Sequence, residues 1–282
     1  MNVLVTGITG FVGQNIVPIL LSCGHKVLGV SRDIDKAKAF DWFEKIDFIC
    51  CDIYKINDKN LELLASQDAI IHLSWSRLPN FKSLYHFEEN LLSDYFFLKQ
   101  LISKGMKQVI VTGTCVEYGM QSGALSEEMR TDPFLPYAVA KDALHRFLES
   151  LQTEYSFNFK WVRLFYMFGK GQDKNSLLSQ LDMAIFNNHS SFNMSKGDQL
   201  RDYLPVDEVS RRIVKLLDSP DIDGTINICN GRPTSVLSIV KSHIKKRQSN
   251  LTINTGYFPY PDYEPLEFWG LSKYFDADGD LL

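Results

Sequence analysis

Thr6-Gly7-Ile8-Thr9-Gly10-Phe11-Val12-Gly13 is the stretch that decides the fold of this chain of 282 residues. It follows a short apolar and β-branched run at residues 2–6, and it opens a helical pattern at 11–23 that contains Pro18. At such a turn, glycines permit a tight bend, close approach of the backbone to a pyrophosphate and close packing of helix on strand. The helix N-terminus then faces the anion. The stretch predicts a phosphate-binding loop; the alternative is a glycine-rich turn without a ligand.

Strand and helix patterns alternate through the first half of the chain. The expected strands after the first are 26–30, 46–50, 69–73 and 108–112. The expected helices among them are 33–44 and 88–103. Continuous apolar strands separated by helices are typical of a parallel sheet covered on both faces. We therefore expect an α/β fold: a Rossmann-like doubly wound parallel sheet with a smaller C-terminal substrate-binding lobe.

The alternation is less regular after residue 112. The patterns there predict a helix at 142–151, a strand at 159–165, loops with a short helix at 170–201, a helix at 206–217, and strands and Pro/Tyr-rich turns from 224 onward. We expect a dinucleotide-binding domain at residues 1–165 with a return segment at about 203–228. Residues 166–202 and 229–282 are expected to form the substrate-binding lobe.

Composition excludes several classes of partner. The net charge of −4 comes from 30 basic and 34 acidic residues without a basic stripe, so no nucleic-acid partner is expected. The five cysteines form no Cys-x-x-Cys pair, and the six histidines show no metal-ligand spacing, so we expect reduced thiols and no metal. We see no signal peptide and no membrane-spanning run, which predicts a cytoplasmic protein without a membrane partner.

The residues after the second expected strand indicate the cofactor. An acid at this position usually binds the ribose hydroxyls of NAD. Here Ser31 and Arg32 follow the strand, and a hydroxyl with a guanidinium suits a 2′-phosphate. We favour NADP(H) over NAD. In the alternative, Arg32 lies in solvent and Asp33 contacts the ribose.

Tyr137 and Lys141 form the second chemical motif. Positions i and i+4 share one face of a helix, so the ammonium can lower the pKa of the phenol and make it a usable acid or base. The same spacing occurs in Tyr95/Lys99 and Tyr166/Lys170, but only Tyr137 opens a helix directly after a proline, Pro136. We therefore assign catalysis to Tyr137 and Lys141.

Thr114 lies just beyond the expected strand at 108–112, in Thr112-Gly113-Thr114-Cys115-Val116-Glu117-Tyr118-Gly119. A hydroxyl at the carboxyl end of a strand is well placed for a ligand in the crevice of such a fold. We expect Thr114 to bind the reacting oxygen; the alternative is a hydroxyl that caps a turn. Glu117 either touches the substrate or belongs to a packed turn.

These motifs together resemble the extended short-chain dehydrogenase/reductase family, also called the NAD-dependent epimerase/dehydratase family, over nearly the whole chain. Within it the sequence resembles nucleotide-sugar 4-ketoreductases. Cys51-Asp52-Ile53 resembles the pair that contacts adenine, and His72-Leu73-Ser74-Trp75 resembles the segment along the cofactor. The implied cofactor-binding residues are Gly7, Thr9, Gly10, Phe11, Val12, Gly13, Ser31, Arg32, Asp52, Ile53, Leu73, Ser74 and Lys141.

The resemblance also implies a substrate site and a dimer. Thr114 falls at the catalytic hydroxyl position, and Arg201 falls on the arginine that contacts the nucleotide diphosphate in relatives. Tyr166 stands where the family often has asparagine. The implied substrate-binding residues are Thr114, Tyr137, Tyr166 and Arg201. Two apolar helices predict a homodimer, or intramolecular burial as the alternative, through Leu91, Leu92, Phe96, Leu101, Leu144, Phe147, Leu148 and Leu151.

One departure from the family narrows the expected reaction. Its 4,6-dehydratases carry Asp-Glu directly after the catalytic threonine, whereas Cys115 and Val116 stand here, which disfavours dehydration. We expect an NAD(P)-dependent oxidoreductase that uses NADPH to reduce the 4-keto group of a nucleotide-linked sugar. A dTDP-4-dehydro-6-deoxyhexose for surface polysaccharide (O-antigen, lipopolysaccharide) is the expected substrate. The alternatives are a nucleotide-sugar 4-epimerase with tightly bound NAD and a dinucleotide-sensing regulator, which the intact Tyr137 disfavours.

Overall fold

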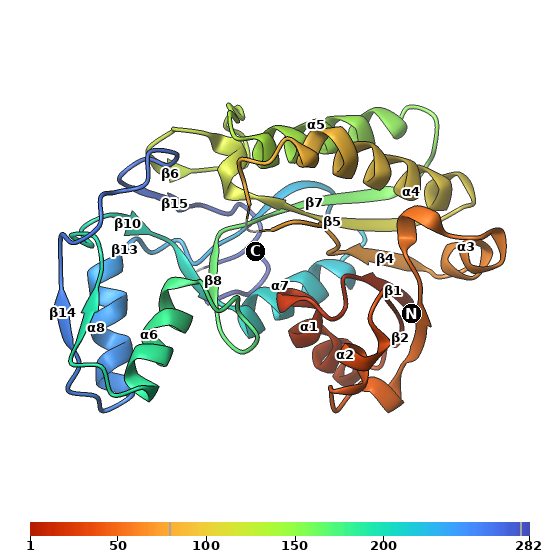
Figure 1. Cartoon of the computed structure of the whole chain (residues 1–282). Coiled ribbons are helices and arrows are strands. Elements are labelled where there is room, and N and C mark those ends of the chain that lie inside the picture. The colour runs from red at the N-terminus through yellow and green to blue at the C-terminus, as the bar shows by residue number, and fades with distance from the viewer. Residues whose placement is uncertain (79, 277) are drawn as a thin grey trace.

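A parallel sheet of seven strands forms the centre of the computed structural model, which describes residues 1–78, 80–276 and 278–282 (Figure 1). The strands are β1 (Asn2–Thr6), β2 (Lys26–Ser31), β3 (Asp47–Cys50), β4 (Ala69–His72), β5 (Gln108–Thr114), β7 (Asn158–Leu164) and β12 (Gly224–Ile228). Their order is β12-β7-β5-β4-β1-β2-β3, and neighbouring strands pair in parallel. This confirms the expected α/β class.

Helices cover both faces of the sheet (Figure 1). One face carries α3 (Asp58–Ala65), α4 (Leu91–Ser103) and α5 (Pro136–Leu151), and the other carries α1 (Phe11–Ser22), α2 (Ile34–Lys38) and α7 (Val206–Leu217). Successive side chains of a strand point to opposite faces, so Val3 and Val5 pack with α1 and α7 while Leu4 packs with α4 and α5. Two apolar cores therefore hold the sheet between its helix layers.

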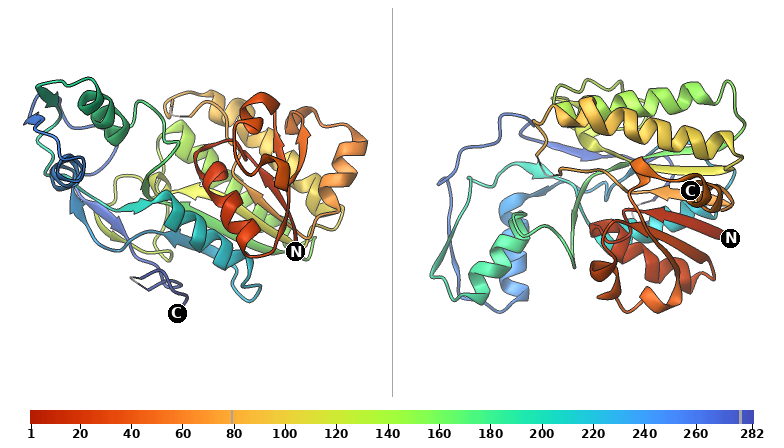
Figure 2. Two further views of the ribbon diagram at one scale, coloured as in Figure 1. Left: turned by 90° about the horizontal axis from the view of Figure 1, so that it is seen from below. Right: turned by 45° about the vertical axis from the view of Figure 1, so that its right-hand side comes forward.

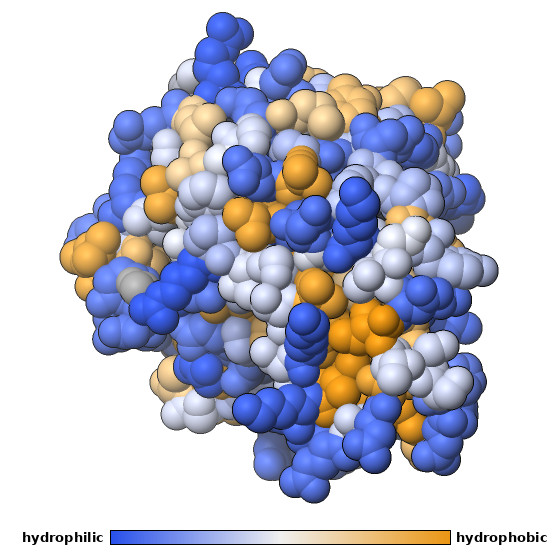
Figure 3. Space-filling view, turned by 90° about the vertical axis from the view of Figure 1, so that its left-hand side faces the viewer, coloured by the Kyte–Doolittle hydropathy of each residue, from blue (hydrophilic) through white to orange (hydrophobic). Residues whose placement is uncertain are grey.

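A smaller lobe has an apolar core of its own. It contains α6 (Leu177–Phe186), α8 (Val236–Lys246), β9 (Ser191–Asn193), β10 (Leu200–Arg201), β13 (Thr234–Ser235) and β14 (Thr252–Asn254). Leu181 of α6 and Val240 of α8 are fully buried in this core. Figure 2 shows α6 and α8 lying together, away from the large sheet. Figure 3 shows the face on the side of this lobe, where several hydrophobic areas lie among hydrophilic side chains.

Two short parallel pairings connect the lobe to the sheet. β8 (Tyr166–Phe168) continues from β7 and pairs with β11 (Tyr203–Pro205). β6 (Gly123–Leu125) pairs with β15 (Phe268–Gly270), near the end of the chain. These pairings place segments distant in sequence beside the carboxyl ends of β5 and β7.

The structure corrects several expected elements. The helix expected at 33–44 ends at Lys38, because Phe40 and Trp42 stack at 4.9 Å and pack into the core instead of continuing it. The helix expected at 88–103 begins as a π-helical turn, η3 (His86–Asn90), before α4. The region from residue 224 onward, expected to hold strands and turns, also contains the helix α8, whose buried residues Val236, Val240 and Ile244 recur at helical spacing. Among the described residues, none of the helices is long and apolar enough to cross a membrane.

Candidate active site

A cavity of about 890 Å³ lies at the carboxyl ends of the central strands. It begins beside β1, where the strand order changes direction between β4 and β2, the usual ligand position in a doubly wound sheet. Every predicted cofactor-binding residue lines it: Gly7, Thr9, Gly10, Phe11, Val12, Gly13, Ser31, Arg32, Asp52, Ile53, Leu73, Ser74 and Lys141. Of the predicted catalytic and substrate-binding residues, Thr114, Tyr137 and Tyr166 line it too, whereas Arg201 does not.

The loop between β1 and α1 has no room for side chains at its glycines. Gly7 has φ +64°, a left-handed conformation that favours glycine. A Cβ on Gly13 would lie 2.3 Å from the Gly7 carbonyl oxygen. Gly10, at the N-cap of α1, supplies no side-chain hydrogen bond, so the first N–H groups of the helix are free to receive an anion. The loop fits the pyrophosphate of a dinucleotide.

The end of β2 presents hydroxyl and cationic groups to the cavity. Ser31, Arg32 and Lys36 line it, and the Ser31 hydroxyl lies 3.1 Å from that of Thr9. The carboxylate of Asp33 accepts the backbone N–H of Lys36 at 2.9 Å and caps α2. Asp33 is therefore engaged by its own helix, and the groups that face the cavity here are those that suit a phosphate.

A buried polar chain supports the floor of the cofactor site. His72 Nδ1 lies 2.9 Å from the Thr6 hydroxyl, and His72 Nε2 lies 2.9 Å from Asp94 Oδ1. The Thr6 oxygen also accepts the backbone N–H groups of the two residues after His72, at 3.2 and 3.4 Å. Asp94 of α4 therefore helps to fix the backbone that lines the cavity. It does so through its contact with His72, which in turn contacts Thr6. The sequence analysis missed this role, although His72 is a polar residue ending a buried strand.

Lys141 is buried within one turn of Tyr137 on α5. Its ammonium donates to the Thr112 carbonyl oxygen at 2.8 Å and lies 4.0 Å from the centre of the Trp75 ring. Burial lowers the pKa of Lys141 to about 8, while the negative charges of Asp94 and Glu117 oppose that change. The Lys141 ammonium is therefore lost at a lower pH than that of an exposed lysine.

Tyr137 is only 8% exposed, and its pKa differs in direction from the expectation. Burial raises the pKa of this phenol above its ordinary value, the charge of Glu117 raises it further, and the hydrogen bond with Thr114 lowers it. The sequence predicted a lowering by Lys141. In the structure the ammonium is engaged by the Thr112 carbonyl and the Trp75 ring, so desolvation of the phenol dominates. The phenol is therefore protonated at neutral pH and holds a proton that it can donate, although its raised pKa makes it a weaker acid than an exposed tyrosine.

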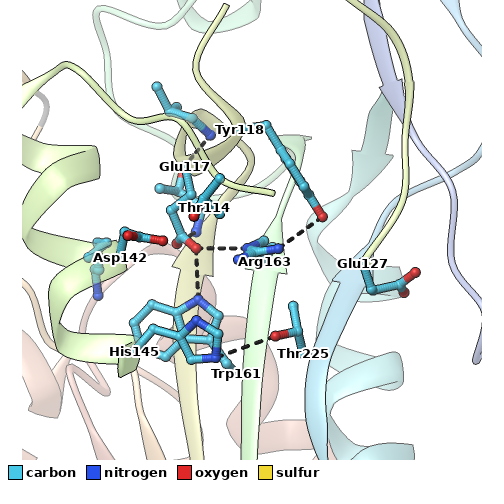
Figure 4. A network of polar contacts seen from close by, with 12 residues as sticks. Thr114, Glu117, Tyr118, Glu127, Asp142, His145, Trp161, Arg163 and Thr225 are labelled. Carbon is cyan, nitrogen blue, oxygen red and sulfur yellow. Dashed lines mark hydrogen bonds and ion pairs between the residues drawn. The ribbon is translucent and has the colours of Figure 1, made fainter. Parts of the chain in front are cut away.

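Glu117 binds the backbone at Thr114 (Figure 4). Its Oε1 accepts the Thr114 N–H at 2.8 Å, and its Oε2 accepts Arg163 Nε at 2.7 Å and Trp161 Nε1 at 2.9 Å. The side chain is fully buried and does not line the cavity. Of the two roles expected for Glu117, the structure places it in a packed turn, where a buried ion pair fixes the position of Thr114.

Glu117 also approaches Asp142 and His145, whose potential metal-ligating atoms all lie within 4.8 Å of one another. Figure 4 shows the three side chains around the same point. The Glu117 oxygens already accept hydrogen bonds from Arg163 and Trp161, so protein donors balance its charge. The hydrogen bonds that Glu117 accepts from Arg163 and Trp161 therefore explain why a buried carboxylate is present in this cluster.

The far end of the cavity contains an acid that the sequence analysis did not single out. The Tyr166 hydroxyl donates to Glu264, and Arg201 Nη2 lies 2.8 Å from Glu264 Oε1. The other donors of Arg201 bind the carbonyl oxygens of Leu200 at 2.8 Å and Leu266 at 2.9 Å. Arg201 is 2% exposed and lies behind Glu264. No local motif marks Glu264, because it enters the site from a segment 98 residues after Tyr166.

The geometry places a glycine loop, a Tyr/Lys helix and a strand-end threonine around one cavity, and the family comparison agrees. The model of the NAD dependent epimerase/dehydratase family matches residues 3–229. The chain belongs to this family, which confirms the resemblance drawn from its motifs and places the protein among enzymes of oxidoreductase type.

The relatives of the chain are enzymes that act on nucleotide sugars. The dTDP-6-deoxy-L-talose 4-dehydrogenase (NAD(+)) of Aggregatibacter actinomycetemcomitans is 26% identical over 272 residues, covering 96% of this chain and 99% of the relative. A UDP-N-acetylglucosamine 4-epimerase from Methanobrevibacter ruminantium M1, solved with UDP-N-acetylmuramic acid, has a TM-score of 0.82 at 24% identity, covering 94% of this chain and 88% of that one. A UDP-glucuronic acid 4-epimerase from Bacillus cereus, solved with UDP-glucuronic acid and NAD, has a TM-score of 0.81 at 24% identity, covering 96% and 90%.

Proposed function

We propose that this protein is a nucleotide-sugar 4-ketoreductase, which reduces the 4-keto group of a dTDP-linked 6-deoxyhexose. The observation that carries the proposal is the meeting of Thr114, Tyr137 and Lys141 with the glycine loop around one cavity. That arrangement can bind a dinucleotide at one end and present a carbonyl group to a buried proton donor at the other. The dTDP-6-deoxy-L-talose 4-dehydrogenase, matched over nearly its whole length, supports the sugar and the nucleotide.

The chain's own residues divide the chemistry among them. A bound nicotinamide dinucleotide would supply the hydride. Thr114 positions the carbonyl oxygen of the sugar, with its own backbone N–H held by Glu117. Tyr137, kept protonated by burial, gives its proton to that oxygen as negative charge develops on it. Lys141, one turn from Tyr137 on α5, binds the ribose beside the nicotinamide.

Reduction rather than dehydration is supported by the residues beside Thr114. Cys115 and Val116 line the cavity where the family's dehydratases carry an acid pair. Burial raises the pKa of the Cys115 thiol, and the charge of Glu264 raises it further, so the thiol stays neutral. A neutral thiol and an apolar side chain offer no acid and base for eliminating water.

Two observations favour different dinucleotides. Arg32 and Lys36 line the cavity beside Ser31, which suits the 2′-phosphate of NADP(H) and supports our preference for it. The relative from Aggregatibacter actinomycetemcomitans carries NAD(+) in its name, and the Bacillus cereus epimerase was solved with NAD, which supports NAD. The ratio of the two dissociation constants decides between them.

We propose residues 1–165 and about 203–228 as the dinucleotide domain, and 166–202 with 229–282 as the substrate lobe. Arg201 remains our candidate for the diphosphate, which requires its ion pair with Glu264 to open. We further propose a cytoplasmic enzyme that supplies sugars for surface polysaccharide.

We also propose that the protein is a homodimer formed through α4 and α5. Phe96 and Phe147 are 54% and 40% exposed on these neighbouring helices, as is Leu92 at 47%. Exposed apolar side chains gathered on one face indicate an interaction surface. Sedimentation analysis should give twice the chain mass, and Phe96→Asp should give the monomer. A wild-type monomer at micromolar concentration would contradict the dimer.

The reaction type is tested with isotopically labelled cofactor. With deuterium at the transferable position of NADPH or NADH, a reductase transfers the label to C4 of the product and consumes cofactor in equal amount. The second candidate, a 4-epimerase, is favoured by the two solved relatives named above. An epimerase recycles its own hydride, so isomerised, unlabelled product without net cofactor oxidation would replace the reductase proposal with this one.

A further inference from the structure

Trp75, which follows β4 in the chain, faces both members of the Tyr137/Lys141 pair. It lines the cavity, and the centre of its ring lies 4.0 Å from the Lys141 nitrogen. The Tyr137 ring stands edge-on to the indole, with the ring centres 6.0 Å apart and 69° between the planes. One aromatic side chain therefore approaches both residues to which we assign catalysis.

The buried Lys141 ammonium makes its hydrogen bond to a neutral backbone carbonyl. Asp94, one carboxylate whose charge acts on it, lies 2.9 Å from His72. Glu117, the other, lies 2.7 Å from Arg163. A buried cation is unfavourable unless it is balanced, and the negative face of an aromatic ring attracts it most strongly where water is excluded. The indole face is therefore a main source of stabilisation for this cation.

His86 fixes the orientation of the indole. Trp75 Nε1 donates to His86 Nδ1 at 3.1 Å, and the two ring planes lie within 22° of each other. Because an indole N–H can only donate, Nδ1 carries no proton, and the proton of the neutral imidazole is on Nε2. That nitrogen lies 2.8 Å from the carbonyl oxygen of Asn80, which can only accept. Burial lowers the pKa of His86, which favours this neutral form.

The π-helical turn η3 supplies both residues that hold this part of the chain. It begins at His86 and ends at Asn90, and turns of this kind are frequent at functional sites. Asn90 donates to the Ser76 carbonyl oxygen at 3.0 Å and accepts the Ser76 hydroxyl at 2.6 Å. The η3 turn therefore binds Trp75 by its side chain and Ser76 by its backbone, so the indole cannot turn away from Lys141 without breaking hydrogen bonds.

We propose that Trp75 is a positioning residue, whose ring face holds the Lys141 side chain at the cavity as a cation, and that His86 fixes the indole for this task. The ring face thus has the electrostatic role that a paired carboxylate would have. The inference deepens the proposed reductase function, in which Lys141 binds the ribose, and rests on that function for its effect on turnover. Without the ring the ammonium is less favoured, so it is lost at a lower pH.

The test observes Lys141 directly by NMR, in the full chain and without cofactor or substrate. Lysines are labelled with carbon-13 at Cε, and the Lys141 signal is identified by its disappearance in Lys141→Met. Protons above the face of an aromatic ring resonate upfield, and Cε is bonded to the nitrogen that lies 4.0 Å from the Trp75 ring centre. In the wild type, the Cε protons of Lys141 should therefore lie upfield of those of exposed lysines.

Two substitutions of Trp75 separate the ring face from the bulk of the side chain. Trp75→Leu should abolish the upfield shift and lower the titration midpoint of Lys141 by about one pH unit. Trp75→Phe keeps a ring face and should give values between those of Trp75→Leu and the wild type. Both variants keep Asp94, Glu117 and His86, the other charged or titratable groups whose charges interact with Lys141. If Trp75→Phe behaved like Trp75→Leu, the ring face would not be the cause.

Trp269→Leu is the matched control. Trp269 lies on β15, is partly buried and does not line the cavity, so its loss should change neither the shift nor the midpoint of Lys141. His86→Phe keeps an aromatic ring but removes the acceptor of the indole N–H, and should reduce the upfield shift without abolishing it. Melting curves show whether each variant folds; Trp75→Met replaces Trp75→Leu if the latter does not.

The NMR experiment and the kinetics fail independently of each other. A wild-type Lys141 signal without an upfield shift, or a midpoint that is unchanged or higher in folded Trp75→Leu, overturns the role of Trp75. An unchanged Lys141 signal in His86→Phe overturns the role of His86 alone. In the reduction of a dTDP-linked 4-keto sugar, the fall of kcat at alkaline pH should move to lower pH by the same amount in Trp75→Leu. If the wild type reduced no such sugar, the proposed function would fail while the NMR result for Trp75 stood.

Discussion

At the dinucleotide end of the cavity the loop after β1 presents backbone, whereas at the sugar end the wall consists of side chains brought together from distant segments. The loop after β1 leaves no space for a Cβ at Gly13, and free N–H groups of α1 follow it directly. At the opposite end, Glu264 and Tyr166 meet although 98 residues separate them. A wall made of backbone tolerates little variation, while one made of side chains can change its ligand by single substitutions.

Among the variants, Tyr137→Phe should have the largest effect on turnover. It tests the proton donor where the dinucleotide end of the cavity meets the sugar end. Turnover should fall by roughly 10² to 10⁴, the usual contribution of a general acid, while the dissociation constant of the cofactor stays the same. Steady-state kinetics and cofactor titration measure the two quantities. Tyr95→Phe is the control, because Tyr95 packs against Phe147 on the outer helices and does not line the cavity. Near-normal turnover of Tyr137→Phe would mean that another group donates the proton.

Arg32→Ala tests the dinucleotide end. Because a hydrogen bond to a charged group contributes about 1.5–3 kcal/mol, the dissociation constant of NADPH should rise at least about tenfold while that of NADH hardly changes. Lys38→Ala, which removes an exposed cation at the end of α2 outside the cavity, should change neither. Equal or tighter binding of NADH by the wild type would contradict the preference for NADP(H).

Asp94→Asn should have the smallest effect and appear mainly in the pH profile. The pKa of Lys141 is about 8, below its ordinary value, so the ammonium is lost as pH rises through that value and activity should fall there. The negative charge of Asp94 raises this pKa, so its removal should move the fall in activity to lower pH, by about one unit or less. Glu89→Gln removes an exposed carboxylate from the preceding turn and should leave the profile unchanged. If Asp94→Asn left the pH profile of activity unchanged, the proposed effect of Asp94 on the pKa of Lys141 would be wrong.

The contrast between the two ends of the cavity also explains which site residues could be predicted from the sequence. The glycine loop, Ser31 and the Tyr137/Lys141 pair are encoded locally, by spacing next to a strand or within one helix, and all of them line the cavity. Residues that act through tertiary contacts were not predictable in this way. Glu264 shows no periodic or motif signal.

Electrostatic properties were also difficult to predict. A one-turn spacing indicated that Lys141 would lower the pKa of Tyr137. The structure shows the ammonium engaged by the Thr112 carbonyl and the Trp75 ring, contacts that spacing alone does not contain. Arg201 was recognised from its motif, but its partner Glu264 was not, so its burial was unexpected.

The core of the smaller lobe has a consequence for how the protein is made. Leu181 of α6 and Val240 of α8 pack in that core, yet α7 and β12 lie between them in the chain, where α7 packs on the large sheet and β12 is one of its strands. During synthesis from the N-terminus, α6 lacks its partner α8 until α7, β12 and α8 itself have been made. The large sheet can therefore assemble before the smaller lobe closes, and a nascent chain that stops after Ile228 exposes the apolar side of α6.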